Sequence, residues 1–299
     1  MKILVSGAAG FIGKCLLDEM TPSLEVWAQT RRTPPPRGAS KVSWIRTNLS
    51  LPLSPRVMPK GVQTVIHLAQ SAHFRDFPGK ADDVFEVNVG GTFRLLEWAR
   101  ASGVRRFIYF SSGGIYGHGQ KGFREEDLLR PQGPLGFYLA SKRCAELMVE
   151  TYAEFFSVII ARPFFVYGLG QKPGMLVPRL VRRVAEGKPI QLQGRDGLRL
   201  NPIHVRDVVR SLKSMIRLSG SHIVNLAGPE VLTMRRLGEI ISGRLGRPAR
   251  FEIQAAERPR HLIGDISRMK ELLGAPRIRF GTGVAELCRS LADGRASSP

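Results

Sequence analysis

The chain has 299 residues, of which 43% are apolar and 23% charged, as in an ordinary globular protein. This length allows one large α/β domain, or a domain of roughly 150 residues with a second one appended. The formal net charge is +20, and the basic excess is mostly arginine spread along the whole chain. It forms no basic tail and no nucleic-acid-binding signature, so we do not expect nucleic acid as a partner.

Hydropathy and cysteine content exclude further classes. No apolar run reaches the roughly 18 uninterrupted residues of a membrane span, and glycines interrupt the N-terminal apolar stretch, which lacks the pattern of a cleaved signal. Cys15, Cys144 and Cys288 are too few and too scattered for a disulfide framework or a metal cluster. We therefore expect a cytoplasmic protein with no metal and no membrane partner.

The N-terminal half alternates apolar strands with amphipathic helices. Residues 1–20 predict a strand, a glycine-rich turn and a helix. Further strands are predicted within 24–30, 62–70, 105–117 and 157–168, and helices within 81–103, ending at Gly103, and 138–156. Alternation of this kind indicates a parallel sheet with helices on both faces. We therefore predict an α/β fold.

After about residue 164 the alternation loosens, and proline and glycine become more frequent. Shorter helices are predicted within 177–187 and 234–246. This change predicts a smaller C-terminal α/β domain.

The stretch "GAAGFIG" sets Gly7, Gly10 and Gly13 between the first strand and the first helix. The first glycine permits the tight turn, the second lets backbone N–H groups approach a pyrophosphate, and the third allows the helix to pack on the strand. The position of the motif at the first strand favours a dinucleotide site over a turn without ligand.

The stretch "FYLASK" sets Tyr138 four residues before Lys142 on a predicted helix, so the two side chains share a face. A phenol titrates near pH 10 and needs help to act as a base at neutral pH. An ammonium group one turn away and an oxidised nicotinamide nearby both favour the phenolate. Alone, this pair is a weak signal.

Together the motifs are specific. "GAAGFIG", "HLAQ", "NVGGT", "SSGGIYG", "YLASK" and "ARPFFVYG" occur in the order found in extended short-chain dehydrogenases/reductases, the sugar-nucleotide epimerase/dehydratase superfamily, which the chain resembles over nearly its whole length. "NPIHVRDVV", "IVNLAGPEVLT" and "DISRMKELLG" are similar to that family's substrate-domain signatures. The resemblance implies a doubly wound Rossmann domain over 1–163 and a substrate-binding domain over 164–299, some segments of which pack back on the first.

The resemblance also implies a catalytic group of Ser112, Tyr138 and Lys142. Ser112 lies four residues before Tyr116, where the family's catalytic Ser or Thr aligns. Tyr138 would exchange the proton of a substrate hydroxyl while hydride passes to or from the nicotinamide. His67 and Ser111 are expected to be structural.

The resemblance implies a further set of cofactor-binding residues. Besides Tyr138 and Lys142 these are Gly7, Gly10, Phe11, Ile12, Gly13, Arg31, Asn48, Leu49, Leu68, Ala69, Asn88 and Pro163. NAD-preferring relatives carry an acidic residue after the second strand, where this chain has Thr30 followed by Arg31. A guanidinium pairs with a 2′-phosphate, so NADP is favoured, with NAD as the alternative.

Departures from the family pattern concern the substrate. Gly113 and Gly114 stand where 4,6-dehydratases have Asp-Glu, which disfavours dehydration. Phe165 replaces a common asparagine, and Leu200 stands where a diphosphate-binding arginine is expected. A one-residue shift to Arg199, or the nearby Arg195, would restore a cation.

We therefore expect Ser112, Gly113, Phe165, Arg195 and Arg199 to contact substrate. The predicted function is hydride transfer at a hydroxyl or keto carbon of a nucleotide sugar, of 4-epimerase or 4-keto-reductase type. Two alternatives are an NADP-dependent reductase of a non-nucleotide hydroxy-ketone or lactone, and a non-catalytic dinucleotide sensor on the same fold. Relatives commonly dimerise through helices around 82–101 and 137–155, so a homodimer is expected.

Overall fold

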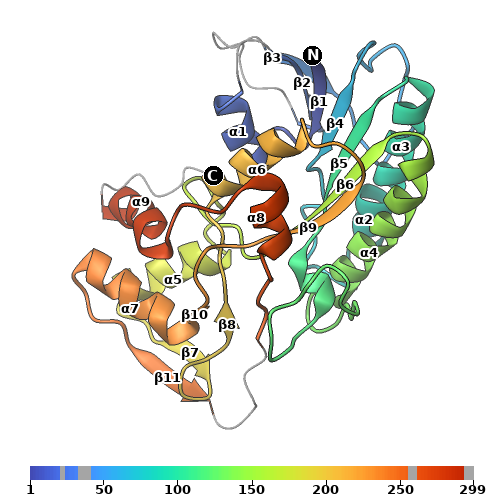
Figure 1. The fold of residues 1–299 in the computed structure, drawn as a ribbon. Helices are drawn as coiled ribbons and strands as arrows, with labels where there is room; N and C mark the ends of the chain where they lie inside the picture. Colours follow the sequence, from blue (N-terminus) through green and yellow to red (C-terminus); the bar gives the residue numbers. More distant parts are fainter. Residues whose placement is uncertain (21–23, 33–41, 255–260, 293–299) are drawn as a thin grey trace. The chain divides into compact units, whose positions relative to one another are not determined.

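The computed structural model describes residues 1–20, 24–32, 42–254 and 261–292 (Figure 1). Its strands are β1 (Lys2–Ser6), β2 (Glu25–Thr30), β3 (Val42–Arg46), β4 (Thr64–His67), β5 (Arg106–Phe110), β6 (Ser157–Pro163), β7 (Ile190–Gln193), β8 (Arg199–Leu200), β9 (His222–Leu226), β10 (Leu232–Thr233) and β11 (Phe251–Gln254). Its α-helices are α1 (Phe11–Asp18), α2 (Ala81–Phe85), α3 (Gly91–Ala101), α4 (Gly136–Thr151), α5 (Leu176–Ala185), α6 (Val205–Met215), α7 (Met234–Leu245), α8 (Ser267–Leu273) and α9 (Phe280–Ala292). A π-helical turn, η1 (Glu86–Gly90), joins α2 to α3, and 3-10 turns form η2 (Gly113–Tyr116) and η3 (Tyr152–Glu154).

The main sheet has the strand order β3-β2-β1-β4-β5-β6-β9. The pairs from β3 through β6 are all parallel. The chain moves outward from β1 through β2 to β3 and then returns to β4 on the other side of β1. Ligands of such open parallel sheets bind at the carboxyl ends of the strands where the order reverses. The predicted doubly wound Rossmann fold is confirmed.

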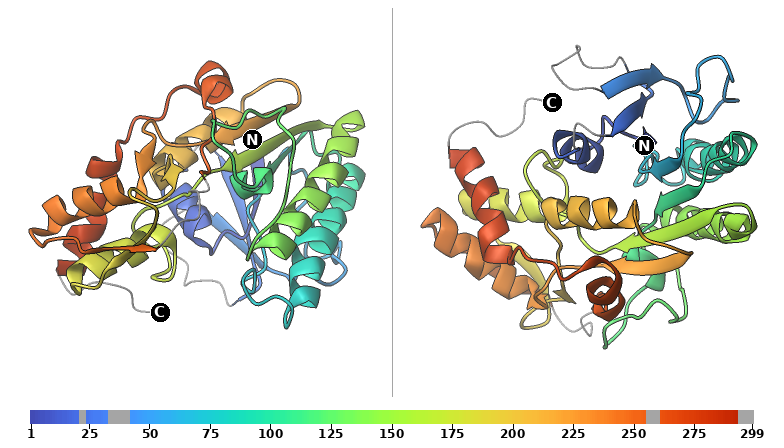
Figure 2. Two further views of the ribbon diagram at one scale, coloured as in Figure 1. Left: turned by 90° about the horizontal axis from the view of Figure 1, so that it is seen from below. Right: turned by 45° about the horizontal axis from the view of Figure 1, so that its top comes forward.

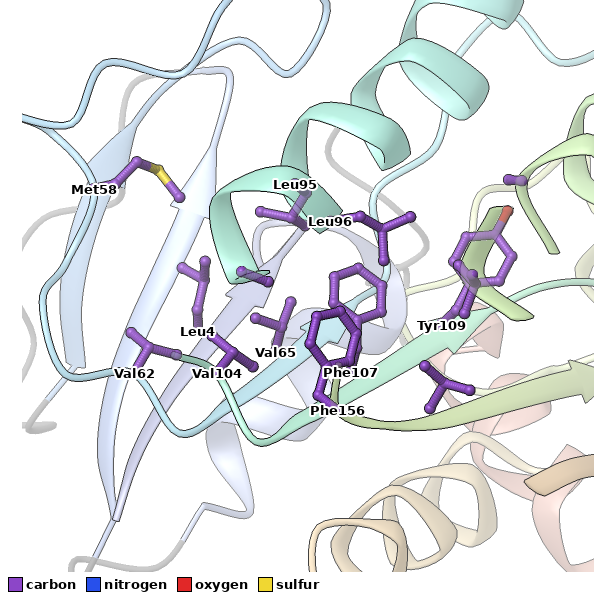
Figure 3. Packing of buried hydrophobic residues seen from close by; sticks show 14 of the residues in the cluster. Leu4, Met58, Val62, Val65, Leu95, Leu96, Val104, Phe107, Tyr109 and Phe156 are labelled. Carbon is purple, nitrogen blue, oxygen red and sulfur yellow. The ribbon is translucent and has the colours of Figure 1, made fainter. Parts of the chain in front are cut away.

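The central strands are buried on both faces, which explains their apolar sequences. Every residue of β4 is buried, and β1 and β5 are buried from their second residue onward. Strand residues such as Leu4, Val65 and Phe107 pack against Leu95 and Leu96 of α3 in one hydrophobic core (Figure 3).

Helices lie on both faces of the sheet. Figures 1 and 2 show α2, α3 and α4 side by side on one face. On the other face the end of α6 lies against α1, where Lys213 Nζ donates to the carbonyl oxygen of Glu19 at 2.9 Å. Among the described residues, no helix combines the length and apolarity that crossing a membrane requires.

The long helix predicted over 81–103 is present but contains the π-helical turn η1. Such turns insert one extra residue and frequently occur at functional sites. The chain leaves this helix at Gly103, whose φ of 68° suits glycine. The sequence-based prediction did not include β3 or β9.

The chain forms two compact units. The first comprises Met1–Gly117, Leu128–Arg162 and Leu212–Val224, and the second comprises His118–Asp127, Pro163–Ser211 and Asn225–Pro299. Within the second unit, α5, α7 and α9 surround a separate hydrophobic core. Strands β7 and β11 pair parallel there, and β8 and β10 pair antiparallel.

Candidate active site

The glycine-rich turn follows β1 at the point where the strand order reverses. Gly7 has a φ of 67°, and a Cβ atom at this position would lie 2.7 Å from the backbone of Ala69, the residue that follows β4 by two. A Cβ atom at Gly13 would lie 2.6 Å from the carbonyl oxygen of Ala8. Both glycines are therefore required by close backbone approaches, as the motif predicts.

Gly10 begins α1 in an extended conformation and gives the helix no side-chain cap. The first turn, which includes the predicted residues Phe11 and Ile12, contains no acidic residue. Unsatisfied N–H groups and the helix dipole make such a terminus an anion site. The turn and the helix start therefore fit a pyrophosphate.

Gln29 supports the turn from β2 and was not predicted from the sequence. Its buried side chain accepts a hydrogen bond from the backbone N–H of Gly7 at 3.1 Å and donates to the carbonyl oxygen of Thr47 at 2.6 Å. A polar residue within the buried end of β2 was the available signal. Arg31 follows β2 directly and is exposed.

Tyr138 lies in the first turn of α4. Its phenol donates to Oε1 of Gln70 at 2.9 Å and also interacts with the hydroxyl of Ser112. Ser112 follows β5 and accepts a hydrogen bond from the backbone N–H of Gly114 at 3.2 Å. Burial raises the pKa of Tyr138 above its ordinary value of 10.0, and the Ser112 interaction opposes that rise. The predicted Ser–Tyr pair is therefore assembled.

Lys142 is one turn further along α4 and is buried. Its ammonium group donates to the carbonyl oxygen of Phe110 at 2.8 Å and lies 5.1 Å from the centre of the Tyr109 ring. Burial lowers the pKa of Lys142 to about 7, while the carboxylate of Glu146 raises it.

Asn88 lies in the π-helical turn η1 and is buried. Its Oδ1 accepts from the backbone N–H of Ser71 at 2.8 Å, and its Nδ2 donates to the hydroxyl of Ser141 at 2.9 Å. Ser141 in turn donates to the carbonyl oxygen of Tyr138 at 2.7 Å. Asn88 therefore ties the segment after β4 to the helix that carries Tyr138.

His67, at the end of β4, is structural, as expected. Thr92 donates to the carbonyl oxygen of Asn88 at 2.5 Å, so its oxygen accepts the Nε2 proton of His67 at 3.0 Å. The other ring nitrogen, Nδ1, then accepts from the hydroxyl of Ser6 at 2.5 Å. Burial and the nearby Lys142 lower the pKa of His67 to about 3, so this ring is neutral.

The remaining predicted cofactor residues follow β3 and β4 or end β6. Leu68 and Ala69 follow β4 and donate to the carbonyl and hydroxyl oxygens of Ser6, at 3.2 and 3.3 Å. Asn48 follows β3 and forms a turn with Ser50, and the neighbouring Leu49 is buried. Pro163 ends β6 in the second unit.

The predicted substrate residues divide between the units. Gly113 is buried in η2 of the first unit. In the second, Phe165 has a φ of 46°, a conformation that asparagine adopts more readily than phenylalanine. Arg195 is exposed, and its carbonyl oxygen accepts two hydrogen bonds from Arg235.

Leu200 is fully buried in the core of the second unit, whereas Arg199 beside it on β8 is exposed. Neighbouring strand residues point to opposite faces. A shift of one residue therefore does not bring Arg199 into the direction of Leu200.

Several residues of the first-unit site were not among the site residues predicted from the sequence. Gln70 binds the Tyr138 phenol, Ser141 and Ser71 bind Asn88, and Asp83 of α2 accepts a hydrogen bond from the Ser71 hydroxyl. Each is a common polar residue whose role depends on a partner distant in sequence.

The comparisons agree with this geometry. The model of the NAD dependent epimerase/dehydratase family matches residues 3–227. An uncharacterized UDP-glucose epimerase of Bacillus subtilis (strain 168) is 29% identical over 300 residues, which cover 91% of this chain and 92% of the relative. A dTDP-4-dehydro-6-deoxy-D-allose reductase of Streptomyces bikiniensis is 26% identical over 314 residues, 96% of this chain and 95% of the relative.

A solved structure of MoeE5 in complex with UDP-glucuronic acid and NAD is similar to the whole fold. The TM-score is 0.84 at 28% identity, and the match covers 98% of this chain and 100% of MoeE5. The family model covers well over half of the chain and includes the glycine-rich turn and the Tyr–Lys helix. The chain therefore belongs to the NAD dependent epimerase/dehydratase family, within the extended short-chain dehydrogenases/reductases.

Proposed function

We propose that this protein transfers hydride at a hydroxyl or keto carbon of a nucleotide sugar, as a 4-epimerase or 4-keto reductase. The arrangement of Ser112, Tyr138 and Lys142 carries this proposal. The phenol has hydrogen-bonding partners in Gln70 and Ser112, and a buried ammonium group lies one turn away on the same helix. A phenol positioned in this way can transfer the proton of a substrate hydroxyl.

The first unit fits a nicotinamide dinucleotide. Gly7 and Gly13 leave no room for side chains, and α1 starts without a side-chain cap. The N–H groups of the first turn of α1 would hold the pyrophosphate, and Lys142 would hold the ribose of the nicotinamide half. When bound, the nicotinamide supplies reversible hydride acceptance from a carbon that carries a hydroxyl group.

Side chains of the protein, and not the cofactor, transfer the proton. The Tyr138 phenolate takes the proton of the substrate hydroxyl as the carbon loses hydride, and it returns that proton when a ketone is reduced. Lys142 stabilises the phenolate electrostatically, and Ser112 bridges the substrate oxygen and the phenol. Asn88 and Ser141 hold the helix that carries Tyr138 in position.

The residues after Ser112 favour simple hydride transfer over 4,6-dehydration. Gly113 and Gly114 form the start of η2, and neither has a side chain that could transfer a proton. A Cβ atom at Gly114 would also lie 2.8 Å from Cδ2 of Leu139. Elimination of water needs an additional acid and base next to the catalytic serine, and these two positions provide none.

For the substrate, we take a nucleotide diphosphate sugar as the first candidate. The similarity to a UDP-glucose epimerase and to a UDP-glucuronic acid complex supports it. The exposed Arg195 is the cation that we assign to the diphosphate, because Arg199 does not point in the direction of Leu200. The burial of Leu200 favours a second candidate, a hydroxy-ketone or lactone without a nucleotide.

The experiment is a panel of UDP- and dTDP-sugars incubated with the purified protein and NAD or NADP, with products identified by NMR. Interconversion of two C4 epimers identifies an epimerase, and cofactor-dependent loss of a 4-keto sugar identifies a reductase. Tyr138→Phe serves as the inactive control. Dinucleotide binding without conversion of any nucleotide sugar would refute the substrate class and leave the non-nucleotide candidate. A cytoplasmic location and a homodimer belong to the same proposal.

A further inference from the structure

An ion pair crosses the carboxyl end of β1. Arg31 directly follows β2, and Asp83 lies in α2, which comes after β4; NH1 of Arg31 is 3.6 Å from Oδ1 of Asp83. Because β1 lies between β2 and β4, the pair spans the strand end from which the glycine-rich turn begins (Figure 1). This is the part of the fold where dinucleotides bind.

The carboxylate of Asp83 is held in place by the protein. The hydroxyl of Ser71 donates to Oδ2 of Asp83, and the backbone N–H of the same serine donates to the buried Asn88. The Asp83 side chain is 24% exposed and that of Arg31 is 48% exposed. Asp83 is thus the fixed member of the pair, and Arg31 is the solvated one.

The stability of an exposed ion pair does not account for this anchoring. Such pairs contribute about 0–1 kcal/mol because water and salt screen them. Asp82, the preceding residue of α2, is exposed and forms no ion pair within the described part of the chain. Of these two neighbouring carboxylates, Asp83 alone is held by Ser71 and pairs with Arg31.

Arg31 is also the residue that would bind a 2′-phosphate. A guanidinium favours NADP by pairing with that dianion. A phosphate that approaches Arg31 meets the fixed Asp83 carboxylate, which repels it and already pairs with the guanidinium. A 2′-hydroxyl carries no charge and leaves the ion pair intact.

We propose that Asp83 is a specificity-determining residue for the dinucleotide. It pairs with Arg31 and so reduces the advantage that Arg31 gives to NADP over NAD. The inference rests on the cofactor part of the proposed function and does not depend on which sugar is the substrate.

The test is isothermal titration of NAD and NADP into the full-length wild type and variants. Asp83→Asn removes the charge, and its amide oxygen still accepts from Ser71. We expect this variant to bind NADP roughly five- to tenfold more tightly, with the affinity for NAD changed less than about twofold. The matched control Asp82→Asn removes a charge from the same helix turn and should change neither affinity by more than about twofold. Thermal midpoints of all variants check folding.

A double variant tests whether the effect of Asp83 depends on its ion pair with Arg31. In an Arg31→Ala background, Asp83→Asn should change the ratio of the two affinities much less than in the wild type, because only the direct repulsion between Asp83 and the 2′-phosphate remains. A ratio unchanged in Asp83→Asn, an equal effect of Asp82→Asn, or a full effect without Arg31 would each overturn the inference while leaving the proposed function standing. Failure of the wild type to bind either dinucleotide would overturn both.

Discussion

The guanidinium of Arg162 donates two hydrogen bonds to the carboxylate of Glu146, from Nε to Oε1 at 3.1 Å and from NH2 to Oε2 at 2.9 Å. Both side chains are buried, and NH1 of Arg162 donates to the hydroxyl of Tyr116 at 2.7 Å. The pair joins the end of β6 to α4 one turn after Lys142. Removing one member of such a pair leaves an uncompensated buried charge.

Glu146→Gln should therefore reduce the free energy of unfolding by about 3–5 kcal/mol. The matched control is Glu150→Gln on the same helix, whose carboxylate is 37% exposed and pairs with Arg143; its cost should stay below about 1 kcal/mol. Urea denaturation measures both. Equal losses in the two variants would show that the buried pair has no special role.

Tyr138→Phe should lower turnover by about 10²–10⁴-fold, because it removes the proton donor and acceptor. The affinity for the dinucleotide should change little, since the glycine-rich turn and α1 are untouched. Steady-state kinetics and titration of the cofactor measure the two effects separately. Unchanged turnover would contradict the catalytic role of Tyr138, whereas cofactor binding without any turnover in the wild type would favour a non-catalytic sensor.

His67 predicts an acid-sensitive stability. Its pKa is about 3 in the folded protein and near 6.5 in an unfolded chain. As the pH falls from 6.5 towards 3, the histidine binds a proton in the unfolded chain before it does so in the folded protein, so the free energy of unfolding decreases. Below pH 3 the histidine is protonated in both states and causes no further loss. The total loss is on the order of 5 kcal/mol.

The measurement compares the unfolding free energy of the wild type with that of His67→Asn, which does not titrate, at intervals across that window. The wild type should lose stability more steeply than the variant as the pH falls. Parallel curves would mean that the pKa of His67 is the same in the folded protein as in the unfolded chain.

Substitutions at Phe165 measure how much its left-handed backbone conformation reduces the stability of the protein. Its positive φ is uncommon for a bulky side chain, and asparagine tolerates this region. Phe165→Asn and Phe165→Ala both lose the packing of the ring on the second core, so their difference isolates the backbone term. We expect the Asn variant to be more stable than the Ala variant by about 1 kcal/mol in thermal denaturation. An Ala variant of equal or greater stability would contradict this reading.

A homodimer is expected to use the outer surfaces of α3 and α4. Phe93 on α3 is 48% exposed and Leu147 on α4 is 50% exposed, and both helices lie on one face of the sheet. Light scattering should give twice the chain mass for the wild type, and Leu147→Glu should shift the protein to monomer. Leu51→Glu, at an exposed position after β3, is the matched control and should leave the dimer intact. A monomeric wild type at micromolar concentration refutes the expectation.

The sequence predicted the strands and helices whose residues carry a local pattern. The glycines of the turn can be recognised from the sequence because the backbone conformation of the turn requires them. The Tyr138–Lys142 pair can be recognised because the helical period places residues four apart on one face. Asp83 and Gln70 carry no such signal, since their roles depend on Arg31 and Tyr138, partners that only the folded sheet brings near. The strand β9 was missed because its one neighbour in the sheet, β6, lies far before it in the sequence, with residues of the second unit in between.

β9 has a consequence for how the protein is made. Residues Leu212–Val224 belong to the first unit, although the second-unit segment Pro163–Ser211 directly precedes them in the chain. The hydroxyl of Ser221, just before β9, accepts a hydrogen bond from the backbone N–H of Val158 on β6 at 3.0 Å. A fragment that stops at Pro163 would present β6 as an open edge, which invites pairing with other chains. On the ribosome, β6 therefore remains an open edge until β9 has been synthesised, long after the helix α4 that carries Tyr138 and Lys142.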